Sequence, residues 1–147
     1  TRAEMLLYMA ARAELVDEVI RPALDAGRSV VSDRYLLANI VYQGHAGGLG
    51  PEVVRRVGAM ATDGLLPDLV FLLDLPPEAA RQRLRGDLDR MESRDDQYQV
   101  QLRAGFLAEA AQSQGRILVI DAAQSIEAIH TEIRQQAERL LQGTSNL

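Results

Sequence analysis

The sequence predicts an α/β fold with a mainly parallel sheet. Three short apolar runs have the length and composition of buried strands, and they lie at Val30-Val31, Leu69–Leu75 and Ile117–Asp121. Longer segments with helical periodicity separate these runs, and strands that alternate with helices form parallel sheets. Acidic residues end or follow each run. Because ligands bind at the carboxyl ends of such strands, these acids mark where a site is expected.

The chain begins with one long predicted helix, from about Glu4 to Ala26. Its apolar residues follow the three-and-four spacing of a buried stripe, which comprises Leu6, Leu7, Ala10, Ala13, Val16, Val19, Ile20 and Leu24. Pro22 is expected to kink this helix or to start a new turn, because proline has no amide hydrogen to donate.

A strand over residues 29–32 and a short helix over Leu36–Val41 come next. Four glycines within seven residues, from Gly44 to Gly50, then predict a flexible loop in which the backbone can approach a ligand closely. A helix over Glu52–Ala61 leads to the apolar strand Leu69–Leu75, which reads as the clearest buried strand of the chain.

The second half continues the alternation. Pro76 and Pro77 start another helix, and a further helix is expected from about Gln97 to Ser113. The strand Ile117–Asp121 follows it. Ser125 is a good N-cap for a final amphipathic helix that extends to about Leu141.

The composition places limits on the function. A chain of 147 residues is one domain by length, and its net charge of -5 argues against a general nucleic-acid binder. No window is apolar enough for a membrane span, and the N-terminus has no signal-peptide pattern. The absence of cysteine excludes disulfides and thiolate chemistry, and fits a cytoplasmic location. The sequence also contains no lysine, so arginine supplies all of its permanent cationic side chains.

Asp33 and Arg34 are the first candidate site residues. They follow a predicted strand directly, where a charged pair can meet a ligand. A structural salt bridge at the strand end is the alternative for a lone pair of this kind.

Tyr8 and Arg12 are four residues apart and therefore adjacent on one face of the first helix. A ring beside a guanidinium can stack on a flat base and donate hydrogen bonds to its edge. Spacing alone favours the alternative, which is a cation-π pair on the helix surface.

Five of the arginines lie in one segment, from Arg81 to Arg94. A guanidinium is a planar fork that binds phosphate oxygens in pairs, so this segment can fold over a polyphosphate. Because acids partly neutralise it, a solvated loop is an equally good interpretation.

In combination, these motifs identify the chain as similar to the thymidylate kinases, the P-loop enzymes that phosphorylate dTMP. The resemblance covers nearly all of the chain in order. The matching motifs are Leu6-Leu7-Tyr8-Met9-Ala10-Ala11-Arg12, Pro22-Ala23-Leu24, Asp33-Arg34-Tyr35, Tyr42-Gln43-Gly44, Pro67-Asp68-Leu69, Leu88-Asp89-Arg90-Met91-Glu92, Arg103-Ala104-Gly105-Phe106-Leu107 and Ile120-Asp121-Ala122.

The resemblance implies roles on the acceptor side. Tyr8 is expected to stack on thymine and Arg12 to donate to its carbonyl edge. Arg34 is expected to bind the acceptor monophosphate, while Tyr35 and Gln43 line the deoxyribose and base pocket. Asp33 would orient the acceptor or, indirectly, the Mg2+ site.

The resemblance also implies a lid over residues 81–96 that contacts ATP. Its expected residues are Arg81, Arg83, Arg85, Arg90 and Glu92, with Arg85 the choice for contact with the transition state. The chemistry agrees with these roles, because phosphoryl transfer depends on alignment and charge neutralisation. The nucleophile is a phosphate oxygen with a second pKa of about 6, so no general base is needed.

The sequence departs from the family pattern in several places. The phosphate-binding loop, with its lysine and its Mg2+-binding Ser or Thr, does not precede the first helix. Gly47 and Gln101 stand where the family often has arginine. The fold expected is therefore a three-layer P-loop kinase-type fold that lacks the N-terminal strands, with residues 1–147 forming the C-terminal two-thirds of a thymidylate kinase-like domain.

The central strand of the family sheet would lie between residues 29–32 and Leu69–Leu75. Its absence would leave two apolar strands unpaired, so we expect a longer gene product or a segment supplied by another chain. The expected function is transfer of the ATP γ-phosphoryl group to dTMP by a homodimer. The alternatives are another nucleoside or deoxynucleoside monophosphate kinase, and a non-catalytic nucleotide-binding module derived from one.

Overall fold

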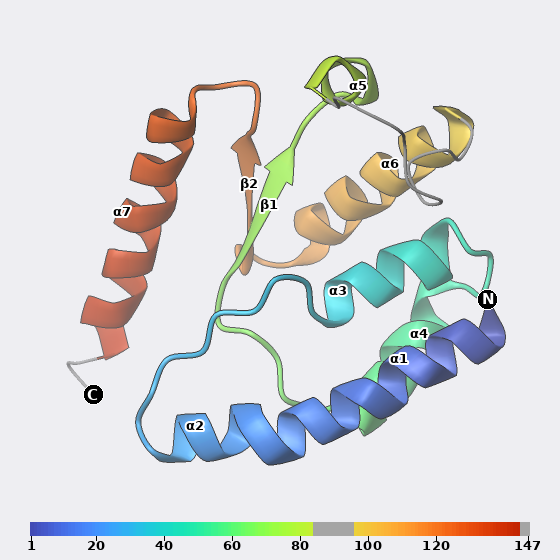
Figure 1. Ribbon diagram of the computed structural model, residues 1–147, viewed down its shortest axis with the longest axis vertical. Coiled ribbons are helices and arrows are strands. Elements are labelled where there is room, and N and C mark those ends of the chain that lie inside the picture. Colours follow the sequence, from blue (N-terminus) through green and yellow to red (C-terminus); the bar gives the residue numbers. More distant parts are fainter. Residues whose placement is uncertain (84–95, 145–147) are drawn as a thin grey trace. The chain divides into compact units, whose positions relative to one another are not determined.

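The computed structural model describes residues 1–83 and 96–144 and divides into two compact units (Figure 1). The first unit comprises Thr1–Asp68 together with Ala104–Phe106, and the second comprises Leu69–Arg103 and Leu107–Leu147. The first is helical, and the second contains the sheet.

One nearly continuous helical run opens the first unit, which confirms the long predicted helix. It consists of α1 (Arg2–Leu15), a π-helical turn η1 (Val16–Ile20) and α2 (Arg21–Asp25). The π turn ends at Ile20, two residues before Pro22, which is the second residue of α2. Proline cannot donate a hydrogen bond to the carbonyl four residues earlier, and its ring crowds that carbonyl. A wider turn relieves both problems without breaking the helix.

The predicted buried stripe of this helix is only partly correct. Val16 and Ile20 are buried, but the other buried positions are Met5, Met9 and Ala23. Leu6, Leu7, Ala10, Val19 and Leu24 are exposed, with Leu7 at 73%. The helix has apolar residues on more than one face, so spacing alone could not identify the inner one. The π turn also shifts the phase of the helix between Met9 and Ile20.

The predicted strand at residues 29–32 is wrong. These residues have no regular secondary structure, and Val31 is 98% exposed. An apolar run becomes a strand only when a neighbouring strand satisfies its backbone groups. No strand of the described residues pairs with this run. Asp33 and Arg34 therefore lie at a bend in a loop and not at the end of a strand.

The helix predicted from Leu36 extends further than expected. It consists of α3 (Leu36–Asn39) and a second π-helical turn, η2 (Ile40–His45), so the predicted glycine loop begins only after His45. Gly47 serves the packing of that loop, because a Cβ there would lie 2.7 Å from the Tyr42 and Gln43 carbonyl oxygens. This glycine is explained by the crowded backbone, without approach to a ligand.

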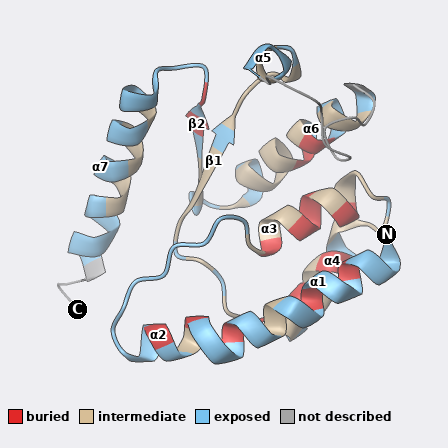
Figure 2. Ribbon diagram, in the orientation of Figure 1, coloured by how far each residue is buried: buried red, intermediate tan, exposed pale blue. Residues whose placement is uncertain are grey.

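The core of the first unit lies where α1 packs against α3, η2 and α4 (Pro51–Ala61). Figure 2 shows the buried positions on these helices. Five side chains form the central cluster: Met5, Met9, Leu36, Ile40 and Val54. The helix predicted at Glu52–Ala61 is confirmed.

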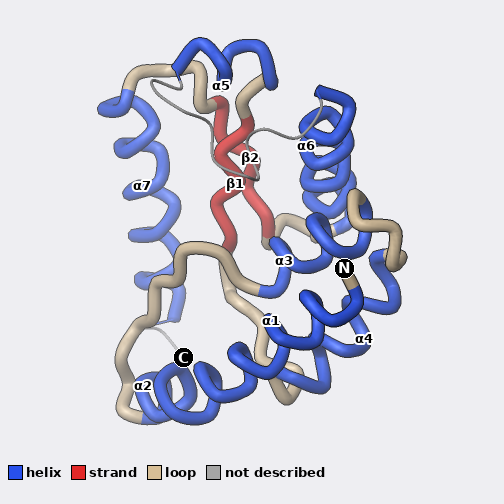
Figure 3. Tube along the Cα trace, turned by 45° about the vertical axis from the view of Figure 1, so that its right-hand side comes forward, coloured by secondary structure: helices blue, strands red, loops and turns tan. Residues whose placement is uncertain are grey.

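The second unit contains a parallel two-stranded sheet, as predicted for this part of the chain (Figure 3). β1 (Val70–Asp74) pairs with β2 (Ile117–Asp121) in a register that places Asp74 opposite Asp121. The helices are α5 (Pro77–Arg83), α7 (Ile126–Thr144) and α6 (Asp96–Gln112), apart from the α6 residues Ala104–Phe106, which belong to the first unit. The Ser125 hydroxyl accepts a hydrogen bond from the Ala128 amide at 3.2 Å, which confirms its N-cap role. β1 is not fully buried, since Leu73 is exposed.

No helix within residues 1–83 and 96–144 combines the length and the apolar character needed to cross a bilayer.

The two methionines Met9 and Met60 provide a test of the core. Met9 is 3% exposed, and Met60 on α4 is 84% exposed. We expect Met9→Ala to lower the free energy of unfolding by about 2–5 kcal/mol, because it removes buried apolar surface and leaves a cavity. Met60→Ala should change it by less than about 0.5 kcal/mol. Urea unfolding measures both, and equal losses would contradict the assignment of the core.

Candidate functional site

A chain of hydrogen bonds connects four polar side chains in the first unit. The Arg12 Nη2 atom donates to Asn39 Oδ1 at 3.0 Å, and Asn39 Nδ2 donates to Gln43 Oε1 at 3.2 Å. Gln43 Nε2 then donates to Glu4 Oε1 at 2.8 Å. All three hydrogen bonds therefore run in the same direction: the cation donates to the first amide, the first amide to the second, and the second amide to the carboxylate. We call these four residues the amide relay.

The amide relay fixes the orientation of both amides. Asn39 and Gln43 are buried, and a buried polar group without a partner costs free energy. Because a guanidinium can only donate, Asn39 must present its oxygen to Arg12. Its nitrogen is then available only to Gln43, and the Gln43 nitrogen to the carboxylate. The relay therefore presents a fixed pattern of donors and acceptors.

Arg12 is held on a second side by an aromatic ring. Its guanidinium carbon lies 4.7 Å from the centroid of Tyr35, within the range of a cation-π contact. Burial lowers the pKa of Arg12 and raises that of Tyr35, and each is partly opposed by the attraction between the two groups. The Tyr35 hydroxyl donates to the Leu65 carbonyl at 3.2 Å. Arg12 Nε is buried and has no partner among the described residues.

The ring that Arg12 contacts is not the one that spacing suggested. The predicted surface cation-π pair with Tyr8 is replaced by the contact with Tyr35, from the loop before α3. Tyr8 is 52% exposed and lines a shallow hollow together with Glu4, Leu7 and Ala11. Its face remains open for stacking.

Arg34 adopts an unusual backbone conformation. Its φ angle is +64°, in the left-handed region that bulky residues seldom occupy. Its guanidinium carbon lies 5.5 Å from the centroid of Tyr42. Asp33 is exposed beside it.

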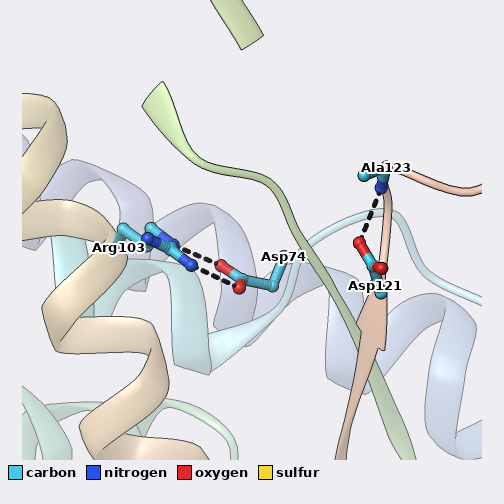
Figure 4. Close-up of polar contacts among 4 residues, drawn as sticks. All are labelled: Asp74, Arg103, Asp121 and Ala123. Carbon is cyan, nitrogen blue, oxygen red and sulfur yellow. Dashed lines mark hydrogen bonds and ion pairs between the residues drawn. The ribbon is translucent and has the colours of Figure 1, made fainter. Parts of the chain in front are cut away.

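The second unit has an acidic edge at the ends of both strands (Figure 4). Asp74 accepts two hydrogen bonds from Arg103, at 2.7 and 2.8 Å, and these bonds hold the pKa of the Asp74 carboxyl below its ordinary value. Asp121 Oδ1 accepts from the Ala123 amide at 2.8 Å. Both acids therefore have structural partners within this unit.

The predicted arginine segment is described only in part. Arg81 and Arg83 are exposed in the last turn of α5. Arg85, Arg90 and Glu92 lie outside the described residues.

The structure thus connects three of the predicted site residues. Arg12 and Gln43 both bond to Asn39, which the sequence patterns did not indicate, and Tyr35 contacts Arg12. The position of Asn39 four residues before Gln43 on a helix was the available signal, because this spacing puts both amides on one face. Glu4, the acceptor of the relay, was missed as well.

The arrangement in the first unit suits a flat polar ligand that carries an anion. A half-buried guanidinium that buried amides hold in one orientation can donate to the edge of a base, and a half-exposed ring can stack on its face. Arg34 is an exposed cation that can bind a phosphate in a forked manner. Cysteine is absent from the sequence, and in the described residues His, Asp and Glu form no group of three that could hold a metal ion.

This chain is similar to known proteins of one family. The family model described as thymidylate kinase matches residues 1–133. A thymidylate kinase of an Exiguobacterium species is 48% identical over 97% of this chain and 68% of its own length. Those of Exiguobacterium sibiricum and Rhodopirellula baltica are 46% and 44% identical, over 88% and 87% of this chain. The chain spans 62% and 52% of their respective lengths.

The Asp74–Arg103 pair leads to a test of pH dependence. The folded pKa of Asp74 is lowered, so its ion pair stabilises the fold above the unfolded pKa of about 3.9 and is lost as the pH falls through the folded value. We expect Asp74→Asn to lower the free energy of unfolding by about 1–2 kcal/mol at pH 7, and by progressively less below pH 4.

Urea titrations at a series of pH values measure this difference. Asp63→Asn is the matched control, since Asp63 pairs with Arg21 but its side chain is 86% exposed. A loss for Asp74→Asn that stays constant down to pH 2 would contradict the assignment.

Proposed function

Because the chain belongs to the thymidylate kinase family, we propose that it supplies the acceptor site and the arginine-rich segment for transfer of the ATP γ-phosphoryl group to dTMP, giving dTDP. The observation that carries this proposal is the amide relay, in which Arg12 and two buried amides are held in one fixed orientation. The product would enter the biosynthesis of dTTP.

The thymine ring presents two carbonyl oxygens and one N–H at its edge. Arg12 as a whole is only half-buried, which supports a role for its guanidinium as donor to a carbonyl of the base. Tyr8 supplies an open ring for stacking on the face of the base. Asn39 and Gln43 fix the position of Arg12, and Gln43 and Tyr35 line the deoxyribose and base pocket.

Arg34 binds the monophosphate of the acceptor in this proposal. Its exposure and its fork of N–H donors suit a phosphate with two negative charges. The attacking oxygen is already ionised at neutral pH, since the second pKa of a phosphate monoester is about 6. The protein therefore needs to align the acceptor and neutralise charge, without removing a proton.

Arginines supply the donor side as well. Arg81 and Arg83 lie at the end of α5, and the sequence places Arg85, Arg90 and Glu92 shortly after it. We assign Arg85 to the charge that develops on the transferred phosphoryl group, and the other arginines to the phosphates of ATP. Residues 81–96 act as the lid in this proposal.

The metal ion proposed for the reaction is Mg2+. Mg2+ is usually bound by one or two carboxylates together with substrate phosphates and water, so an all-protein cage is not required. The exposed carboxylate of Asp33, next to Arg34, fits this limited and indirect role. When bound, Mg2+ neutralises charge on the phosphates.

We also propose that the protein acts as a homodimer in the cytoplasm. The exposed apolar side chains along α1, η1 and α2 support contact of this helical run with a partner; they include Leu6, Leu15, Val19 and Leu24. A second copy of the chain would remove them from water. The absence of cysteine fits a reducing compartment.

Calorimetric titration of the chain with dTMP and with thymidine tests the acceptor site. Arg34→Ala should weaken dTMP binding about ten- to hundredfold and leave thymidine unchanged, because only dTMP carries the phosphate. Arg12→Met should weaken both ligands to a similar extent, since it acts on the base. Arg139→Ala, an exposed arginine of α7, is the control and should bind as the parent does.

Failure of the parent chain to bind dTMP would overturn the proposed function. Separate titration with ATP and Mg2+ then tells whether this chain also holds the donor.

Arg85 is tested by turnover in protein that shows thymidylate kinase activity. We expect Arg85→Ala to lower kcat about hundredfold or more while dTMP affinity changes little, because its contact is made in the transition state. A coupled assay of dTDP formation gives kcat, and calorimetry gives the affinity. Unchanged turnover would remove Arg85 from its assigned role.

A further inference from the structure

Three side chains, one cationic and two aromatic, contact one another in series within the first unit. The Arg34 guanidinium carbon lies 5.5 Å from the centroid of Tyr42. The Tyr42 ring in turn meets Phe106 with centroids 6.1 Å apart and an interplanar angle of 76°, an edge-to-face contact. Tyr42 is in η2, and Phe106 is one of the three α6 residues that belong to this unit.

Both the backbone and the side chain of Arg34 are held by neighbouring groups. A non-glycine residue at φ +64° is strained and persists only where its surroundings hold it. The Ser32 hydroxyl donates to the Arg34 carbonyl at 2.9 Å and holds the main chain. The long side chain would otherwise sample many rotamers, and the Tyr42 ring is the contact that restricts it.

The position of Phe106 depends on the residue before it. A Cβ at Gly105 would lie 3.0 Å from Val41 Cγ1 and 3.1 Å from His45 Cβ, which is closer than ordinary van der Waals contact. Glycine therefore allows residues 104–106 to approach η2 closely. This close approach puts the Phe106 ring against Tyr42, one residue along from Val41.

We propose that Phe106 and Tyr42 are positioning residues that hold the Arg34 guanidinium for the acceptor phosphate. Phe106 fixes the Tyr42 ring, and the face of that ring fixes the cation. This inference rests on the proposed function, because it assumes that Arg34 binds the phosphate. Phe106 itself needs no contact with the nucleotide.

The test compares dTMP with thymidine by calorimetry. We expect Phe106→Leu to weaken dTMP binding about three- to tenfold, as the loss of an ordered cation-π contact implies, and to change thymidine binding less than about twofold. In the Arg34→Ala background, Phe106→Leu should have no further effect on dTMP, because the group through which it acts is gone. Tyr42→Leu should behave like Phe106→Leu, and Tyr42→Phe should keep most of the affinity since it keeps the ring.

The matched control is Phe71→Leu, which changes the other phenylalanine of the chain, in β1 of the second unit. It should leave dTMP binding unchanged. If Phe106→Leu does not fold, as circular dichroism and thermal melting would show, the comparison of Tyr42→Leu with Tyr42→Phe decides the question alone.

Two outcomes overturn the inference. One is equal weakening of dTMP and thymidine by Phe106→Leu and Tyr42→Leu, which would indicate a general structural role. The other is unchanged dTMP binding in both variants while Arg34→Ala weakens it, which would leave the proposed function standing. Unchanged dTMP binding in Arg34→Ala would instead contradict the role proposed for Arg34.

Discussion

The first unit depends on satisfying one half-buried cation, Arg12. Its guanidinium requires acceptors. Asn39 of α3 provides one amide oxygen, and Tyr35, in the loop before α3, provides the face of one ring. The amide that accepts from Arg12 then needs an acceptor for its own N–H group, and so does the next amide. The relay ends at Glu4, on the same helix as Arg12 and about two turns earlier. α1 therefore supplies both charged ends of the relay, and α3 with η2 supplies the two neutral links between them.

The same helix also contributes to the apolar core. Met5 and Met9 pack against Leu36, Ile40 and Val54, while Glu4 and Arg12 satisfy polar partners. The core and the amide relay are thus formed by the same few turns of helix. A substitution in the core that displaces α1 would lengthen the hydrogen bonds of the relay, since both depend on the distance between α1 and α3. The orientation of the relay side chains therefore depends on the packing of the core.

Much of the fold could be predicted from the sequence. Strong periodicity and terminal signals located α4, α7 and both strands, and the structure places the acids at the two strand ends opposite each other. The irregular conformation of residues 29–32 could not be predicted, because a strand forms only beside a neighbouring strand and local composition does not show whether one is present. The inner face of α1 was misjudged because leucines lie on its outside. In the candidate site, the resemblance pointed to Arg12, Tyr35 and Gln43. The spacing of Asn39 and Gln43 could be seen in the sequence, but the bond from Arg12 to Asn39 becomes evident only when α1 and α3, which are distant in sequence, are brought together.

The π turn at Val16–Ile20 has a consequence for deletions in this part of the chain. A π turn holds one more residue than the α-helical turn it replaces, so it behaves as an insertion absorbed within a helix. Deletion of a single residue there would restore a regular helix and rotate the residues before the turn by about 100° relative to those after it. Met5 and Met9 would then leave the core while Ile20 stayed in it. The packing of this helix therefore depends on the number of residues in the turn as well as on the buried side chains, Val16 and Ile20, that the turn contributes.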